Sequence, residues 1–193
     1  MEKKSPIDFE KAFRELDHLL GLHHAKLHLI VCGGYLIQRM GFRTTIDVDA
    51  FYTANEQIAL LIQRVGSLLD INTGKTIWLN NAVSTMSDWP DPQYCEPLFA
   101  YEHLTVDQVT TEYLLGMKLC SIRDVDLSDA GRIVQEKQWH DPIALYHALT
   151  QMKMKVNMAS MLEAFARAYG DEWRTEYWKA HDGEILDLIN VNW

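Results

Sequence analysis

Residues 27–51, LHLIVCGGYLIQRMGFRTTIDVDAF, decide the fold that we expect for the chain. An apolar run, Leu29 to Cys32, stops at Gly33-Gly34, and a short amphipathic stretch, 35–40, follows it. Residues 46–50 then alternate apolar and acidic side chains, and Phe51 follows them. These patterns predict a strand, a glycine turn, a helix and a second strand. A glycine turn before a helix can bring backbone N–H groups close to a phosphate.

Two aspartates stand at alternate positions of the second predicted strand. Residues two apart on a strand point to the same face, with Cα atoms roughly 6.6 Å apart. Asp47 and Asp49 should therefore project together, while Ile46, Val48 and Ala50 face the other side. Two unpaired carboxylates this close repel each other, and a hard divalent cation such as Mg²⁺ removes the conflict. The combination favours a metal site over the alternative, a solvated acidic strand face.

Composition limits the class of protein. The chain has 193 residues, of which 48% are hydrophobic and 23% charged, so global disorder is excluded. The formal net charge of −9 argues against a broadly basic nucleic-acid binder. No apolar run is long enough to span a membrane, and residues 1–13 lack the apolar core of a signal peptide, so we expect a cytoplasmic protein without a membrane partner. The three cysteines are odd in number and scattered, which indicates no disulfide framework.

Around this stretch the N-terminal half alternates helices and strands. Ser5 and Pro6 predict the start of a first helix that ends at Gly21. Thr53 and Glu56 have the spacing of a capping box, which predicts a second helix to about residue 69. A short strand over 76–79, a proline-containing loop over 88–92 and a strand over 98–106 complete this half.

The remaining sequence is helical in pattern. Thr110 or Thr111 is expected to cap a helix over 112–122, and a second helix follows the acidic segment 123–129. From Asp141 onward two or three helical segments are expected, with a break at Gly170-Asp171. The predicted fold class is α+β, with a small mixed sheet flanked by helices over residues 1–107. A C-terminal helical bundle over residues 108–193 should pack on this core.

In its central stretch the chain resembles the polymerase-β-type nucleotidyltransferase superfamily, whose signature is a Gly-Gly or Gly-Ser turn followed by Asp-x-Asp. The longer form Arg43-x-Thr45-x-Asp47-Val48-Asp49 is similar to the AbiEii-type bacterial toxin nucleotidyltransferases. EYLLGMKL (112–119), followed by RDVDLSD (123–129), resembles their Lys-bearing helix and Asp-rich helix start. Trp78-Leu79-Asn80 looks like a further recurrent element. The resemblance covers roughly residues 25–135.

The resemblance implies roles for individual residues. Asp47 and Asp49 would hold Mg²⁺ or Mn²⁺ and form the catalytic pair. The nucleotide and its phosphates would be bound by the following residues: Gly33, Gly34, Arg43, Thr45, Lys118 and Asp126. Asp126 could instead orient Lys118 or the acceptor. For Lys118 the alternative is a solvated face of a mostly apolar helix, and for Arg43 it is a structural role in a turn.

The chain departs from the family pattern in two ways. The second small residue of the turn is often serine, whereas Gly34 offers only its backbone. The usual third carboxylate has no certain counterpart, and the candidates are Glu102, Asp107, Asp88 and Asp91. A zinc site is disfavoured, because no compact set of Cys and His completes four ligands.

The expected function is transfer of a nucleoside monophosphate from an NTP to an acceptor hydroxyl or phosphate. By resemblance the enzyme would be a toxin-type protein acting on tRNA or on a protein, with a possible cognate antitoxin. The main alternative is a catalytically inactive nucleotidyltransferase-fold module that binds nucleotide or a protein partner. A third hypothesis is an antibiotic-modifying enzyme with a small-molecule acceptor.

Overall fold

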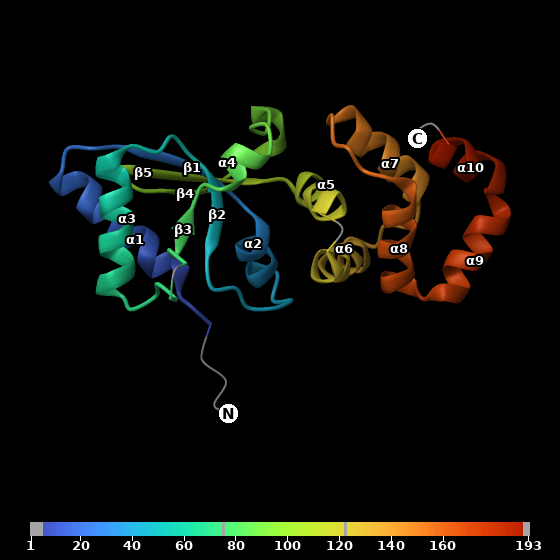
Figure 1. Ribbon diagram of the computed structural model, residues 1–193, viewed down its shortest axis with the longest axis horizontal. Coiled ribbons are helices and arrows are strands. Elements are labelled where there is room, and N and C mark those ends of the chain that lie inside the picture. The colour runs from blue at the N-terminus through green and yellow to red at the C-terminus, as the bar shows by residue number, and fades with distance from the viewer. Residues whose placement is uncertain (1–5, 75, 122, 191–193) are drawn as a thin grey trace, which may run out of the picture. The chain divides into compact units, whose positions relative to one another are not determined.

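The computed structural model describes residues 6–74, 76–121 and 123–190 of the chain. Within it the chain divides into two compact units, residues 1–110 and residues 111–193, and each is described by itself (Figure 1). The predicted boundary after residue 107 lies close to this division. Ser5 and Ile122, which the sequence placed at helix ends, lie outside the described residues.

A five-stranded mixed sheet organises the first unit. The order of its strands is β3-β2-β1-β5-β4, with β1 antiparallel to β2 and parallel to β5. The elements are α1 (Phe9–Leu22), β1 (Leu27–Cys32), α2 (Gly33–Arg39), β2 (Val48–Phe51), α3 (Glu56–Leu68), β3 (Leu79–Asn80), α4 (Val83–Met86), η1 (Pro92–Tyr94), β4 (Cys95–Ala100) and β5 (Leu104–Val109). The predicted small mixed sheet flanked by helices is confirmed.

One face of this sheet is covered by helices and forms the core. Alternate residues of β1, β2 and β5 are buried there: Leu27, Leu29, Val31, Val48, Ala50, Leu104 and Val106. Figure 1 shows α1 and α3 side by side on one side of the strands, and α4 beside β2 on the other. Trp78 is fully buried among the core side chains, and its Nε1 donates to the carbonyl oxygen of Ile62 at 2.9 Å. The opposite face carries the polar residues of the candidate site.

Two helices begin at caps that the sequence analysis placed wrongly. α1 begins at Phe9, because the Asp8 side chain accepts from the Lys11 N–H, so the helix starts after Ser5 and Pro6. α3 begins at Glu56, capped by the Asn55 side chain at 2.8 Å from the Ile58 N–H, and not at Thr53. In both cases the side-chain oxygen that accepts from an N–H group of the first turn belongs to a residue closer to the helix than the predicted cap.

The strands also differ from the predicted ones. β2 begins at Val48, and Ile46 is 51% exposed instead of facing the core. The single strand expected over 98–106 is a hairpin of β4 and β5, with a register shift between Pro97 and Phe99. β3 has only two residues, Leu79 and Asn80, which pair with Val48 and Asp49 of β2.

Every regular element described in the second unit is a helix, as predicted. The helices are α5 (Thr111–Ser121), α6 (Asp124–Glu136), α7 (Pro142–Gln151), α8 (Met158–Tyr169), α9 (Asp171–Ala180) and α10 (Asp182–Asn190). The predicted break is confirmed at Gly170, which separates α8 from α9 with φ of +97°. Close packing of α6 on α8 needs Gly131, where a Cβ would lie 3.0 Å from the carbonyl oxygen of Ala164. None of the helices described in either unit is long and apolar enough to cross a bilayer.

Candidate functional site

The side chain of Asp49 lies directly against the glycine turn. Gly33 has φ of +66°, and a Cβ built on it would lie 2.6 Å from Oδ2 of Asp49. The contact follows from the sheet, because Asp49 on β2 pairs with Cys32, the residue before the turn. The structure therefore brings together the turn and one of the two predicted catalytic carboxylates.

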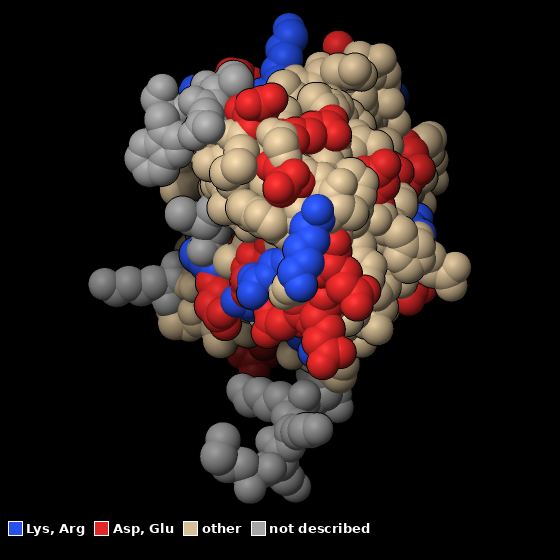
Figure 2. Space-filling view, turned by 90° about the vertical axis from the view of Figure 1, so that its right-hand side faces the viewer, with Lys and Arg blue, Asp and Glu red and all other residues tan. Residues whose placement is uncertain are grey.

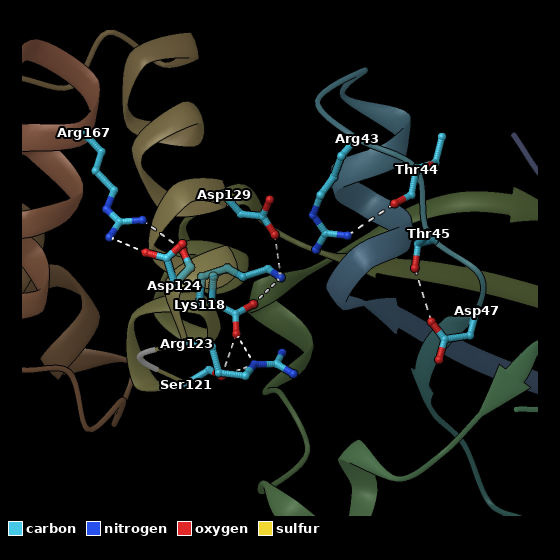
Figure 3. A network of polar contacts seen from close by, with 11 residues as sticks. Arg43, Thr44, Thr45, Asp47, Lys118, Ser121, Arg123, Asp124, Asp129 and Arg167 are labelled. Atoms are coloured by element: carbon cyan, nitrogen blue, oxygen red, sulfur yellow. Dashed lines mark hydrogen bonds and ion pairs between the residues drawn. The ribbon is translucent and has the colours of Figure 1, made fainter. Parts of the chain in front are cut away.

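Asp47 lies one residue before β2, in contact with a hydroxyl and an amide. Its Oδ1 accepts from Thr45 Oγ1 at 3.2 Å, as Figure 3 shows, and its Oδ2 accepts from Asn80 Nδ2 at 3.4 Å. Thr45 also lies over the second glycine, since a Cβ on Gly34 would lie 2.8 Å from Thr45 Oγ1. Both aspartates are half-buried, and both are next to the turn through these contacts.

The segment before β2 is fixed by a side chain that the sequence analysis missed. Gln38 of α2 accepts from the Thr45 N–H through Oε1 at 2.9 Å and donates to the Ile7 carbonyl oxygen through Nε2 at 3.0 Å. Arg43 donates to the Thr44 carbonyl oxygen at 3.4 Å and has its Nη1 3.8 Å from a Cβ built on Gly34. Arg43 therefore extends over the turn, on the side of Thr45.

Asn80 is the third polar side chain beside the aspartates, and the sequence analysis gave it no role. It pairs in register with Asp49, donates to Asp47 and accepts from the Ala82 N–H at 3.2 Å. Neighbouring strands place it there, so the third oxygen-bearing side chain of this group is an amide and not a carboxylate. The only sequence signal was the element Trp78-Leu79-Asn80.

None of the four candidates for a third carboxylate joins this group. Asp107 is on the same face of the sheet as Asp49, but the two are two strands and two residues apart, roughly 12 Å between Cα atoms. Its Oδ2 lies 2.7 Å from Nε2 of His28. Asp91 caps η1, while Asp88 and Glu102 are exposed. Across the ranges that the structure describes, no three His, Cys, Asp or Glu side chains are grouped for metal binding.

The donor chemistry nevertheless suits magnesium. Mg²⁺ is usually held by one or two carboxylates together with water and substrate phosphates, so it does not need a cage of protein ligands. Asp47 and Asp49 supply two carboxylates, and the Asn80 amide oxygen keeps a lone pair beyond the bond from Ala82. This oxygen-only set disfavours zinc, which prefers nitrogen and sulfur ligands.

Lys118 and Asp126, the remaining predicted residues, meet in the second unit. Nζ of Lys118 lies 2.7 Å from Asp126 Oδ1 and 3.0 Å from Asp129 Oδ2, and the three side chains are at most 6% exposed. Ser121 and Arg123 donate to the other oxygen of Asp126 (Figure 3). Burial alone would raise the pKa of Asp126, but the hydrogen bonds from Arg123, Lys118 and Ser121 lower it to about 2. Lys118, Asp126 and Asp129 form a buried ion cluster that joins α5 to α6, with the exposed Ser121 and Arg123 at its edge.

The comparisons with known proteins leave the family open. No protein-family model matches the chain, and no curated protein matches it. The two aspartates, their neighbours and the glycine turn are the part of the molecule that bears on function.

Proposed function

We propose that the chain is a metal-dependent nucleotidyltransferase that moves a nucleoside monophosphate from an NTP to an acceptor. The observation that carries the proposal is the contact between Asp49 and Gly33. It places a carboxylate next to a turn whose residues have no side chains of their own, so a metal ligand lies beside backbone N–H groups of the kind that bind phosphate. A bound Mg²⁺ or Mn²⁺ would neutralise phosphate charge there.

The chain's own residues have distinct tasks in this proposal. An oxygen of the acceptor attacks the α-phosphorus, the bond to the β-phosphate oxygen breaks, pyrophosphate leaves and the acceptor proton passes to solvent. Asp47 and Asp49 bind the cation, while Thr45 and Asn80 fix the orientation of the Asp47 carboxylate through its two oxygens. Gly33 and Gly34 add no side chain to a turn that Asp49, Thr45 and Arg43 already border, so phosphates would meet their backbone N–H groups.

The ion cluster in the second unit favours a structural task for Lys118. Its ammonium group contacts two buried carboxylates, and a lysine so engaged would have to break these contacts to reach a phosphate. We assign Asp126 the same structural task, which replaces the phosphate-binding role implied by the family resemblance.

The helical unit has an acidic surface on α9 and α10. Acidic side chains are spread over the face in Figure 2. Six exposed acidic residues lie on α9 and α10, against two basic residues: Asp171, Glu172, Glu176, Asp182, Glu184 and Asp187, with Arg174 and Lys179. A polyanion is repelled by such a surface, so α9 and α10 do not suit the binding of tRNA.

A labelling experiment tests the proposal. The protein is incubated with α-³²P-labelled NTPs, Mg²⁺ or Mn²⁺ and bacterial extract, and label on macromolecules and small acceptors is measured. We expect labelling by the wild type and by Asp107→Asn, and a loss of at least 100-fold in Asp47→Asn and Asp49→Asn, because removal of one charge-stabilising group costs about 100- to 1,000-fold. Equal labelling by the wild type and the Asp47 and Asp49 variants would contradict the proposal.

The Asn80 amide favours one alternative, a nucleotide-binding module without catalysis. In place of a third carboxylate, an amide lies beside Asp47 and Asp49, and it supplies neither negative charge nor a base. Calorimetry with Mg²⁺ and NTP separates the two functions. Binding that depends on Asp47 and Asp49, together with no pyrophosphate release in the presence of extract, would favour the module.

A further inference from the structure

Trp89 is a half-exposed aromatic side chain on the site face of the sheet. It lies in the loop between α4 and η1 and is 49% exposed. Its ring packs on one side against Phe51 of β2, with centroids 5.9 Å apart and planes inclined by 56°. One part of the indole is thus fixed by the protein, while the rest is open to solvent.

Phe51 connects Trp89 to the candidate metal site. Phe51 and Asp49 are two residues apart on β2 and point to the same face, with Cα atoms roughly 6.6 Å apart. Phe51 is as fully buried as Val48 and Ala50 on the other face, so the sheet is covered on both faces at this point. Phe51 therefore links Trp89 and Asp49: it is two residues from Asp49 along β2, and its ring contacts the indole, which lies on the face that carries Asp49.

The loop that carries Trp89 is held in place. Pro90, the next residue, is buried, and Asp91 caps η1 by accepting from the Gln93 N–H at 3.1 Å. The Asp91 carbonyl oxygen also accepts from the Cys95 thiol at 3.7 Å. Trp89 is thus presented by an anchored segment, and a ring fixed in this way loses little conformational entropy when it binds a ligand.

We propose that Trp89 is the stacking platform for the nucleobase of the bound nucleotide. This inference rests on the proposed function, because it takes Asp47 and Asp49 as the binding site of the metal and the phosphates. Stacking uses the π-face that every base has, so the platform gives affinity for a nucleoside triphosphate without selecting one base.

The test compares ligands with and without a base. Affinities for Mg²⁺-ATP, Mg²⁺-CTP and Mg²⁺-tripolyphosphate are measured by calorimetry for the wild type, Trp89→Ala, Trp89→Phe and Met86→Ala. Met86 is the matched control, because it is an apolar side chain of the same region with 82% exposure. Circular dichroism checks that each variant is folded.

We expect Trp89→Ala to weaken the affinity for both nucleotides by about 5- to 100-fold, the range for one base–aromatic stack. The affinity for tripolyphosphate should not change. Trp89→Phe should retain most of the affinity, and Met86→Ala all of it. Equal binding of ATP by the wild type and Trp89→Ala would overturn the platform and leave the proposed function standing. If the wild type binds neither nucleotide nor tripolyphosphate, the proposed function fails, and the platform fails with it.

Discussion

The carboxylate of Asp49 occupies the space that a side chain on Gly33 would need. A Cβ at position 33 would lie 2.6 Å from Asp49 Oδ2 and 3.3 Å from its Cβ, and the backbone there has φ of +66°. We predict that Gly33→Ala lowers the free energy of unfolding by about 2–4 kcal/mol, because a left-handed backbone cost and a steric clash add. Urea unfolding measures this loss.

Gly41→Ala is the control for the backbone part of that loss. Gly41 has φ of +78°, and no atom lies within 4 Å of an added Cβ. Gly41→Ala should therefore lower the free energy of unfolding only through its left-handed backbone, by about 1–2 kcal/mol. A Gly33→Ala loss no larger than the Gly41→Ala loss would show that Asp49 does not press on the turn.

Asn80→Asp should convert the site into one with three carboxylates. Without metal we expect a lower melting temperature, because the new charge lies beside Asp47 and Asp49. With Mn²⁺ in excess the variant should gain more in melting temperature than the wild type, since binding to the folded state stabilises it. Thermal unfolding at several Mn²⁺ concentrations gives both numbers, and identical Mn²⁺ responses would count against a metal site here.

The site was predictable where it depends on one strand and its turn. The alternation around Val48 predicted the direction of the Asp49 side chain, and the pairing of Asp49 with Cys32 brings it to Gly33. Asp47, which the same pattern placed on the strand, lies before β2. The role of Asn80 depends on parallel pairing of β2 with β3, across the whole of α3, and no local pattern reports such pairing. Gln38 was missed for the same reason, because its partners are backbone groups of Ile7 and Thr45.

Lys118→Met should destabilise the second unit strongly. It removes the ammonium group that contacts both Asp126 and Asp129, which are 1% and 2% exposed, and leaves only the bonds from their other partners. Removing one partner of a buried ion pair typically costs about 3–5 kcal/mol. The triple variant Lys118→Met, Asp126→Asn, Asp129→Asn removes the charges together and should recover at least half of the loss in urea unfolding. No recovery would mean that the lysine acts through packing and not through charge.

Asp126→Asn should lose stability in a way that depends on pH. Hydrogen bonds lower the pKa of Asp126 from 3.8 to about 2, so its ionised form stabilises the folded state above pH 4. That stabilisation is about 2 kcal/mol and disappears as the pH falls through 2. Urea unfolding at pH 6 and pH 2.5 should therefore show a difference between wild type and variant that shrinks at the lower pH. A constant difference would rule out this linkage.

The fold outside the central stretch was predicted less completely. The sequence analysis took residues 98–106 as one strand, because Tyr101-Glu102-His103 has no Gly, Asn or Pro to indicate a turn. The turn is stabilised instead by Asp17 of α1, which accepts from the N–H groups of His103 and Leu104 at 2.7 and 2.9 Å. A partner 86 residues away in the sequence leaves no local signal.

The deeply buried Trp78 holds one edge of the candidate site. Its carbonyl oxygen accepts from the Val48 N–H at 2.7 Å, and its indole is fixed to Ile62 inside the protein, so the position of the two-residue strand β3 depends on how this ring is packed. A substitution that shrinks the ring would shift Asn80 away from the aspartates without touching any polar atom there. If the proposed activity exists, a genetic screen for its loss would recover changes at Trp78 together with changes at Asp47 and Asp49, although the indole is buried in the core.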